Sequence, residues 1–471
     1  MLSIAGQKSP KLAAGGLLML VVLCGCGSTY RPVVTPINPT GPPPQPSVAV
    51  AVVSQQNAPG QAPLPTTVGV ATVIDFAGDS IMAQGYVGPG PAAMAMAQSG
   101  SIIYSINSDH TLSSVPVSVA SGQAPLSPRV LTTTLLPTST PVNALSTSSI
   151  YLADSANNEI DFLSGSPAAL KQAIPVSLGP VGIVGNATGQ RVYAITQQLP
   201  PNTCDTPTQG VNGEIDSIET STNSVSNKIP VGVCPVYGIQ SVDTRRVFIL
   251  NRGSGTVTVI DGQANQLNSQ TYGVDQLPCN TVNHPYNCQT FTVGGGPVYA
   301  ELYQAGSILV TANYDSSTVS FIDVSTDVYG NNSANFGHVL ATVPVGLHPS
   351  SVTVLQDGSR AYTANQGDGT VSVIDMSSCT VKRVIVIPAD DTSTTGVSRP
   401  RSVASVTNSL YSKVYVTSPD SPRVTIIRTD TDAIAATVQL PGNVVGLRTA
   451  LQNVGGANTI NASNSIGSGT P

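Results

Sequence analysis

Residues 349–375 read PSSVTVLQDGSRAYTANQGDGTVSVID. Three short runs in this stretch, 349–354, 360–365 and 370–375, alternate apolar residues with small or polar ones, and turns rich in Gly and Asp separate them. Alternation with a period of two, interrupted by turn residues, is typical of β-strands joined in hairpins. The stretch therefore predicts three strands of one antiparallel sheet.

The same pattern returns along the whole chain. A second strand ends in a small polar residue, a third usually closes on an acid, and a fourth apolar run often ends in Val-Gly. Four antiparallel strands in about 50 residues form one blade of a β-propeller, and we find no helical run of ten or more residues between the units. Eight prolines open the pattern: Pro91, Pro141, Pro180, Pro235, Pro297, Pro349, Pro400 and Pro441.

These phrases resemble the YVTN-type β-propeller repeat, and the units at 297–346 and 349–388 match it best. The resemblance covers about residues 47–451 and implies an all-β propeller of four-stranded antiparallel blades. It implies little about activity, because propellers host many unrelated functions.

Each end of the repeat region holds part of a blade. The run from Val444 to Leu451 resembles a first strand, whereas Val48–Ser54, Thr67–Asp75 and Ile81–Val87 resemble a second, third and fourth. Together they predict a composite last blade, which would close the ring and remove exposed sheet edges. Seven complete units and this composite predict eight blades; seven is the alternative, because the family that the chain resembles more often has seven.

Composition limits the classes of partner. Only 9% of the 471 residues are charged, the net charge is −6, and the chain contains no Trp. A nucleic-acid-binding protein needs a basic surface, and no long basic run is visible, so we expect no nucleic-acid partner.

The N-terminal sequence predicts export. Lys8 and Lys11 precede an apolar stretch from Leu12 to Leu23, the arrangement of a signal peptide. The following Leu23-Cys24-Gly25-Cys26 resembles a bacterial lipobox, which implies cleavage after residue 25 and a lipid on Cys26. An ordinary signal peptide with incidental cysteines is the alternative.

Two segments outside the propeller complete the predicted organisation. Residues 26–46 form a Pro-rich tether behind the lipidated cysteine, the propeller occupies 47–451, and 452–471 form a disordered tail rich in Gly, Ser and Asn. Cys26 is followed by Gly27 and Ser28, which favours an outer-membrane or cell-surface address over the inner membrane. We therefore expect a membrane-anchored lipoprotein outside the cytoplasm.

The cysteines behind the signal peptide can form disulfides in an exported protein. Cys279 and Cys288 lie in the longest insertion and are the first candidate pair. Cys204 and Cys234 lie in loops that propellers place on one face, so they form the second. Cys379 is left over and is interpreted as a partly buried strand residue.

Residues with metal-binding or catalytic chemistry are few. A zinc site from Cys279, His284 and Cys288 fits no established ligand spacing, and we predict neither a metal nor a cofactor. No Gly-x-Ser-x-Gly motif occurs, and no histidine has a partner at a recognisable catalytic spacing. The recurrent acids, among them Asp261 and Asp375, are expected to cap turns. Tyrosines recur at another repeat position and are expected to pack between blades: Tyr104, Tyr151, Tyr193, Tyr362 and Tyr415.

One face of the ring is the candidate binding surface. It carries the residue before each junction proline, which includes His348 and Arg399, and the loops that follow the second strands. The rim candidates are His348, Arg399, Asn313, Asp315, Asn365 and Asp368.

The sequence favours a non-enzymatic binding or scaffold module in the cell envelope, with a protein, a peptide or an envelope polymer as its partner. A propeller hydrolase of lactonase type, using Asp315, Asp368, His348 and Arg399 at the channel mouth, is the alternative. A structural cell-surface protein that acts by coverage or adhesion is the third interpretation.

Overall fold

The computed structural model describes residues 49–450, all within the unit Gln45–Pro471, except for a set of loop segments. The segments left out are 58–63, 65, 77, 97–101, 117–130, 135–138, 145–148, 166–167, 186–189, 201–203, 205–209, 242, 269–287, 304–306, 356, 390–395 and 408–411. The expected signal peptide, tether and tail lie outside the described residues.

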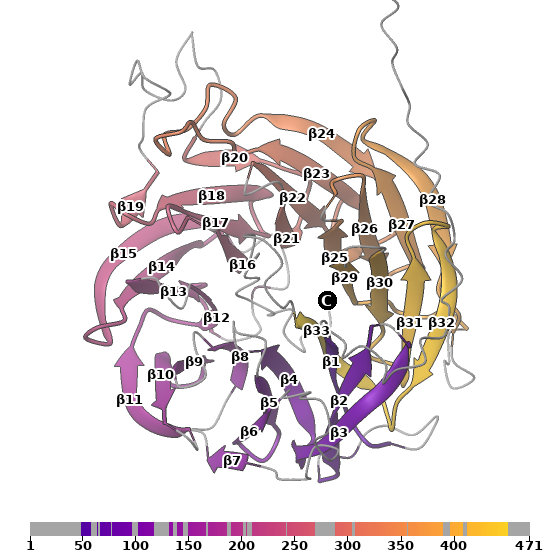
Figure 1. Cartoon of the computed structure of the whole chain (residues 1–471). Coiled ribbons are helices and arrows are strands. Elements are labelled where there is room, and N and C mark those ends of the chain that lie inside the picture. The colour runs from indigo at the N-terminus through magenta and orange to yellow at the C-terminus, as the bar shows by residue number, and fades with distance from the viewer. Residues whose placement is uncertain are drawn as a thin grey trace, which may run out of the picture. The chain divides into compact units, whose positions relative to one another are not determined.

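The described chain forms eight antiparallel sheets, each built from consecutive strands except for one that joins both ends. Figure 1 shows these sheets as blades around a common centre, which confirms the predicted eight-bladed β-propeller. Blades 1 and 2 comprise β4 (Pro91–Met96), β5 (Ile102–Asn107), β6 (Thr111–Pro116), β7 (Leu131–Thr134), and β8 (Ser139–Ala144), β9 (Ser149–Asp154), β10 (Glu159–Ser164), β11 (Ala169–Pro175). Blades 3 and 4 comprise β12 (Pro180–Gly185), β13 (Arg191–Thr196), β14 (Asn212–Glu219), β15 (Ser224–Val233), and β16 (Pro235–Gln240), β17 (Arg246–Asn251), β18 (Thr256–Asp261), β19 (Gln266–Leu267), β20 (Thr290–Thr292). Blades 5 and 6 comprise β21 (Pro297–Tyr303), β22 (Ile308–Asn313), β23 (Thr318–Asp323), β24 (Val339–Pro344), and β25 (Pro349–Val354), β26 (Arg360–Asn365), β27 (Thr370–Asp375), β28 (Thr380–Val386). Blade 7 comprises β29 (Ser402–Thr407), β30 (Ser412–Thr417), β31 (Arg423–Arg428) and β32 (Ala433–Gln439), and blade 8 comprises β33 (Val444–Ala450), β1 (Ala49–Ser54), β2 (Val68–Asp75) and β3 (Ser80–Pro89).

Burial explains the residue pattern of each blade. The second and third strands are buried on both faces because neighbouring blades pack against them, as in β26 and β27. The fourth strand is the outer one, and most side chains of β28 are exposed. Blade 4 departs from the simple plan, because β19 and β20 both pair with β18 on either side of the long insertion at 269–287.

Blade 8 closes the ring as predicted. β33 pairs with β1 in antiparallel register, with Val52 opposite Leu447. The innermost strands contact one another in sequence from β4 through β8, β12, β16, β21, β25 and β29 to β33, and β33 contacts β4. The composite blade also shares one apolar cluster with blade 7 and another with blade 1.

Polar contacts reinforce this closure. Lys413 of β30 forms an ion pair with Asp79 (Nζ–Oδ1 2.6 Å), donates to the Phe76 carbonyl (2.7 Å) and lies over the Phe76 ring. Near the other end of the strands, the backbone N–H of Gln55 donates to the backbone carbonyl of Asn443. N-terminal and C-terminal residues are therefore joined by backbone pairing, apolar packing and a buried cation.

Tyrosines at one repeat position bridge neighbouring blades. Tyr104, Tyr151, Tyr193, Tyr362 and Tyr415 are all buried, which confirms their expected role in packing between blades. The Tyr362 hydroxyl donates to Asp432 in the next blade (2.6 Å), and Arg360 forms an ion pair with the same carboxylate (2.8 Å). These contacts lie at the end of the ring where second strands begin, opposite the junction prolines.

The recurrent acids have the expected capping role. Asp261 Oδ1 accepts hydrogen bonds from the backbone N–H groups of Gln263 and Ala264, and Asp375 does the same for Ser377 and Ser378. Hydrogen bonds to the carboxylate hold the pKa of Asp375 below its usual value, the Ser377 hydroxyl making the largest contribution.

Ring closure gives a first prediction. A chain ending at residue 443 loses β33 and exposes both the free edge of β1 and the apolar clusters on each side of it. We expect the melting temperature, measured by circular dichroism, to fall by more than about 10 °C, because one strand removes several buried side chains worth roughly 1.5–3 kcal/mol each. The matched control ends at residue 451 and should melt with the full chain; equal stability of all three proteins would contradict closure by β33.

Candidate functional site

The residue before each junction proline is held by the loop after a second strand. In five blades its backbone carbonyl accepts a hydrogen bond from the N–H of the residue that follows that strand, and in all five its φ is positive. These backbone contacts place both sets of loops on one face of the ring. The pairs are Gly90 with Ser108, Gly179 with Gln197, Cys234 with Arg252, Gly296 with Tyr314, and His348 with Gln366.

His348 occupies a backbone position that favours glycine. Its φ is 53°, and the equivalent residues Gly90, Gly179 and Gly296 are glycines. A positive φ costs a residue with a side chain free energy, and such strain is concentrated at functional sites. The imidazole therefore stands in a fixed, locally strained position on the junction face.

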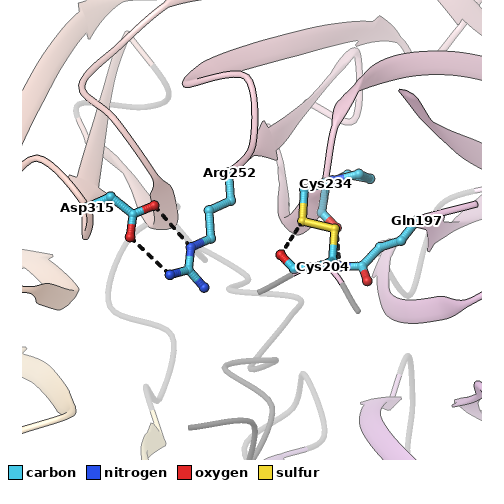
Figure 2. Close-up of a disulfide and its surroundings, with 6 residues drawn as sticks. Gln197, Cys204, Cys234, Arg252 and Asp315 are labelled. Atoms are coloured by element: carbon cyan, nitrogen blue, oxygen red, sulfur yellow. Dashed lines mark hydrogen bonds and ion pairs between the residues drawn. A yellow bond between two sulfur atoms is a disulfide. The ribbon is translucent and has the colours of Figure 1, made fainter. Parts of the chain in front are cut away.

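Three side chains from blades 4 and 5 meet beside His348. The Tyr314 ring stacks on the His348 ring with centroids 4.6 Å apart and an interplanar angle of 12°. The Arg252 guanidinium lies 5.3 Å from the Tyr314 centroid and donates two hydrogen bonds to Asp315, at 3.2 and 3.0 Å. Figure 2 shows the two-pronged Arg252–Asp315 pair. We call Arg252, Tyr314, Asp315 and His348 the rim cluster.

Two further arginines contribute charge near this cluster. Burial raises the pKa of Tyr314, and Asp315 adds to this rise. Arg252, Arg399 and Arg401 oppose it. Burial lowers the pKa of Arg401, and Tyr314 opposes that shift. Arg399 is exposed beside Pro400, and its junction differs from the others because the Arg401 N–H, not that of a loop residue, donates to Thr417.

A disulfide joins two loops next to the rim cluster. The structure links Cys204, in the loop after β13, to Cys234 at the junction of blades 3 and 4, with Cα atoms 5.7 Å apart. The Arg252 backbone N–H donates to the Cys234 carbonyl (2.9 Å), so the arginine is bonded to a residue of the disulfide. Figure 2 shows the disulfide and Arg252 on neighbouring loops. Gln197 adds a bond from its side-chain amide to the Pro235 carbonyl.

The rim candidates Asn313 and Asn365 are fully buried inside their blades. Asn365 donates from Nδ2 to the hydroxyls of Thr370 and Ser372, both at 2.9 Å, and Asn313 makes the equivalent bonds. A Cβ added to Gly346 would come within 2.5 Å of the Asn365 amide, which explains why a glycine precedes this junction. These asparagines therefore fasten the turns that carry the rim.

The two carboxylates proposed for the rim are both engaged. Asp315 pairs with Arg252, and Asp368 accepts from the Leu347 N–H (3.0 Å) and the Thr370 hydroxyl (2.7 Å). Arg252, Tyr314 and Arg401 were not among the sequence candidates. Arg252 and Tyr314 directly follow the asparagines that end the second strands. This repeat position was the signal in the sequence that could have identified them as rim residues.

The remaining cysteines are less informative. Cys26 and Cys279 lie outside the described residues, and Cys288 is buried. Cys379 is a half-buried free thiol in the turn before β28, not within the strand; burial, with a smaller effect of Asp375, raises its pKa. Among the described residues, no group of three or more His, Cys, Asp or Glu is placed to hold a metal ion, and no helix has the length and apolar character to span a membrane.

No protein-family model and no curated protein matches the sequence. Solved propellers match the structure: AztD from Citrobacter koseri (TM-score 0.55, 13% identity, 85% of this chain and 97% of that one) and the dihydro-heme d1 dehydrogenase NirN in complex with DHE (TM-score 0.57, 10% identity, 88% and 77%). A putative 6-phosphogluconolactonase from Bacteroides fragilis matches with a TM-score of 0.49 and 12% identity, over 87% of this chain and 99% of that one. The first two likenesses show the fold and leave the function open.

The disulfide gives a second prediction. Replacing both Cys204 and Cys234 by serine should lower the free energy of unfolding by about 3 kcal/mol, the effect expected when a loop of this size is no longer closed in the unfolded chain. Denaturant unfolding of both proteins, with and without reductant, measures it. A double variant as stable as the oxidised native chain would contradict a stabilising role for this bond.

Proposed function

We propose that this chain is an exported, membrane-tethered β-propeller that binds an acidic segment of a partner protein on its junction face and catalyses no reaction. The observation that carries the proposal is the rim cluster, in which Tyr314 contacts both Arg252 of the preceding blade and His348 of the following one. Arg399 and Arg401 lie close enough to Tyr314 to influence its pKa.

The chemistry of this surface suits an acidic peptide. Arginine and tyrosine dominate the binding energy of protein interfaces, and guanidinium groups bind carboxylates with two parallel hydrogen bonds. Three arginines stand here against Asp315 and Asp368, in a chain whose net charge is −6. These five charges around the rim cluster sum to +1, which would favour an acidic partner there.

The rim is also held in place before any partner arrives. The disulfide, the backbone bonds to Cys234 and His348, and the buried asparagines fix its loops. A surface with fixed side chains loses less conformational entropy when it binds. On the opposite face, polar groups such as those of Tyr362 and Asp432 are used in hydrogen bonds between neighbouring blades.

Binding at the rim is the third prediction. A fluorescent glutamate-rich peptide should bind the full-length chain, and the affinity should fall as salt rises. Arg399→Ala and His348→Ala should each weaken binding about fivefold, whereas Arg428→Ala, which removes an exposed arginine paired with Asp430, should not. Fluorescence anisotropy measures the affinities.

Two results would contradict this function. One is equal binding of the peptide by the native chain and both rim variants. The other is a preference for a neutral glutamine-rich peptide or for an anionic polysaccharide over the acidic peptide.

Membrane attachment is the fourth prediction. Cys26→Ala should remove the lipid acceptor and move the protein from the membrane fraction to the soluble fraction, because the expected anchor is covalent. Cell fractionation with metabolic labelling by a radioactive fatty acid measures this, with Cys24→Ala as the matched control. Label retained in Cys26→Ala would contradict lipidation at this residue.

A further inference from the structure

Blade 5 carries a turn that its neighbours lack. In most blades four residues join the third strand to the fourth, such as 376–379 in blade 6, but residues 324–338 make this connection in blade 5. The Ser333 N–H donates to the Ser325 carbonyl (3.0 Å), which closes a small hairpin within the connection. We call residues 325–333 the tip hairpin.

Hydrogen bonds inside the tip hairpin fix its shape. Asp327 Oδ1 accepts from the N–H groups of Tyr329 (2.8 Å) and Asn331 (2.9 Å), and Oδ2 accepts from the Asn331 side chain (3.0 Å). The Asp327 N–H donates in turn to the Asn331 carbonyl (2.8 Å). The one carboxylate of the tip hairpin is therefore engaged, and the backbone of its turn is held.

Two arginines of blade 4 hold the tip hairpin from outside. Arg245 donates to the Tyr329 carbonyl, and Arg246 donates to the Gly330 carbonyl (3.4 Å) and to Asn332 Oδ1 (3.1 Å). Arg246 and Asn332 are both buried. A Cβ on Gly330, whose φ is 80°, would overlap the Arg245 guanidinium, so this close approach requires glycine. The tip hairpin is thus bonded to two blades of the ring.

Two apolar side chains stand at the turn of this hairpin. Val328 is 93% exposed, more than any other large apolar residue that the structure describes, and Tyr329 is 70% exposed. Because the backbone that carries them is already fixed, binding through these side chains costs little conformational entropy. An exposed apolar pair on a fixed backbone is suited to contact with another apolar surface.

The tip hairpin lies at the end of the ring at which the chain enters it. It follows Asp323, which pairs with Ile308, the first residue of a second strand. In blade 8 the corresponding pair is Asp75 and Ala49, the first residue of β1. The N-terminal segment, which includes the proposed lipid acceptor Cys26, therefore joins the ring at the same end as the tip hairpin.

We propose that the tip hairpin docks on the bilayer that holds the anchor, with the Val328 and Tyr329 side chains inserted among the lipid headgroups. Tyrosine favours the membrane interface, because its ring is apolar and its hydroxyl can reach water. Docking places the junction face, at the opposite end of the ring, toward the solvent. This docking rests on the membrane attachment that belongs to the proposed function, and it adds the orientation of the ring.

A weak contact is enough for this role. Residues 27–48 can span at most about 75 Å, so the anchor alone leaves either end of the ring free to face the bilayer. Anchoring keeps the tip hairpin at a high effective concentration near the lipids, and a modest preference then decides the orientation. Two inserted side chains supply such a preference.

A single fluorescent reporter gives the fifth prediction. The chain contains no Trp, so Tyr329→Trp introduces the only one. A histidine tag inserted after Gly27 attaches the full-length variant to phosphatidylcholine vesicles that contain a nickel-chelating lipid, whether or not Cys26 is lipidated. On these vesicles the emission should shift to shorter wavelengths, and brominated lipids should quench it, because the indole lies at the membrane interface.

Matched variants separate docking from mere proximity to the bilayer. Val386→Trp replaces a residue that is also 70% exposed, but Val386 pairs with Thr370 at the junction end of blade 6, so brominated lipids should leave its emission unchanged. Val328→Ser, added to Tyr329→Trp, should lower the docking equilibrium constant about tenfold and remove most of the quenching, as expected for losing one inserted aliphatic side chain. All these sites are exposed, so the melting temperature should not change.

Four results would overturn the docking. They are the same Tyr329→Trp emission with and without vesicles, equal quenching of Tyr329→Trp and Val386→Trp, undiminished quenching after Val328→Ser, and a shift that needs high protein concentration and no vesicles. The last result would assign the tip hairpin to a second copy of the chain. Binding of the acidic peptide and fractionation of Cys26→Ala test the proposed function separately, because neither measurement uses the tip hairpin.

Discussion

The pairing of β1 with β33 is the constraint on which the rest of the structure depends. Every blade must bury both faces of its middle strands against a neighbour, and a ring gives each blade two neighbours only if its ends meet. The chain solves this by sharing blade 8 between its termini, with Val52 opposite Leu447 and Lys413 bound to Asp79. Without this closure, β1 and the apolar clusters beside it would face solvent.

The two ends of the ring have different roles. Contacts such as Tyr362 with Asp432 join neighbouring blades at the end where second strands begin, and turn-capping acids such as Asp375 lie at the same end. At the other end, buried asparagines and backbone bonds hold loops whose side chains project from the junctions. Both ends therefore hold neighbouring blades together, and the proposed function uses the side chains of the junction face.

Much of the fold could be predicted because the same pattern of strands and turns recurs along the chain. The prolines, the alternating strands and the incomplete blades at each end predicted eight blades and their closure, and the regular position of Tyr362 and Asp375 predicted their packing and capping. The sequence could not distinguish the structural roles of residues that are adjacent in the chain. Asn313 and Tyr314 are adjacent, yet the first is buried in a blade and the second stacks on His348. The pairing of Arg252 with Asp315 leaves no spacing signal either, because the two residues come from different blades.

Hydrogen exchange of the backbone amides of β33 in the native state tests the central claim most directly. If β33 completes blade 8, its amides that face β1 should exchange as slowly as those of β1 and β2, through opening of the whole ring. Rapid exchange of β33, while β1 and β2 remain protected, would contradict the account.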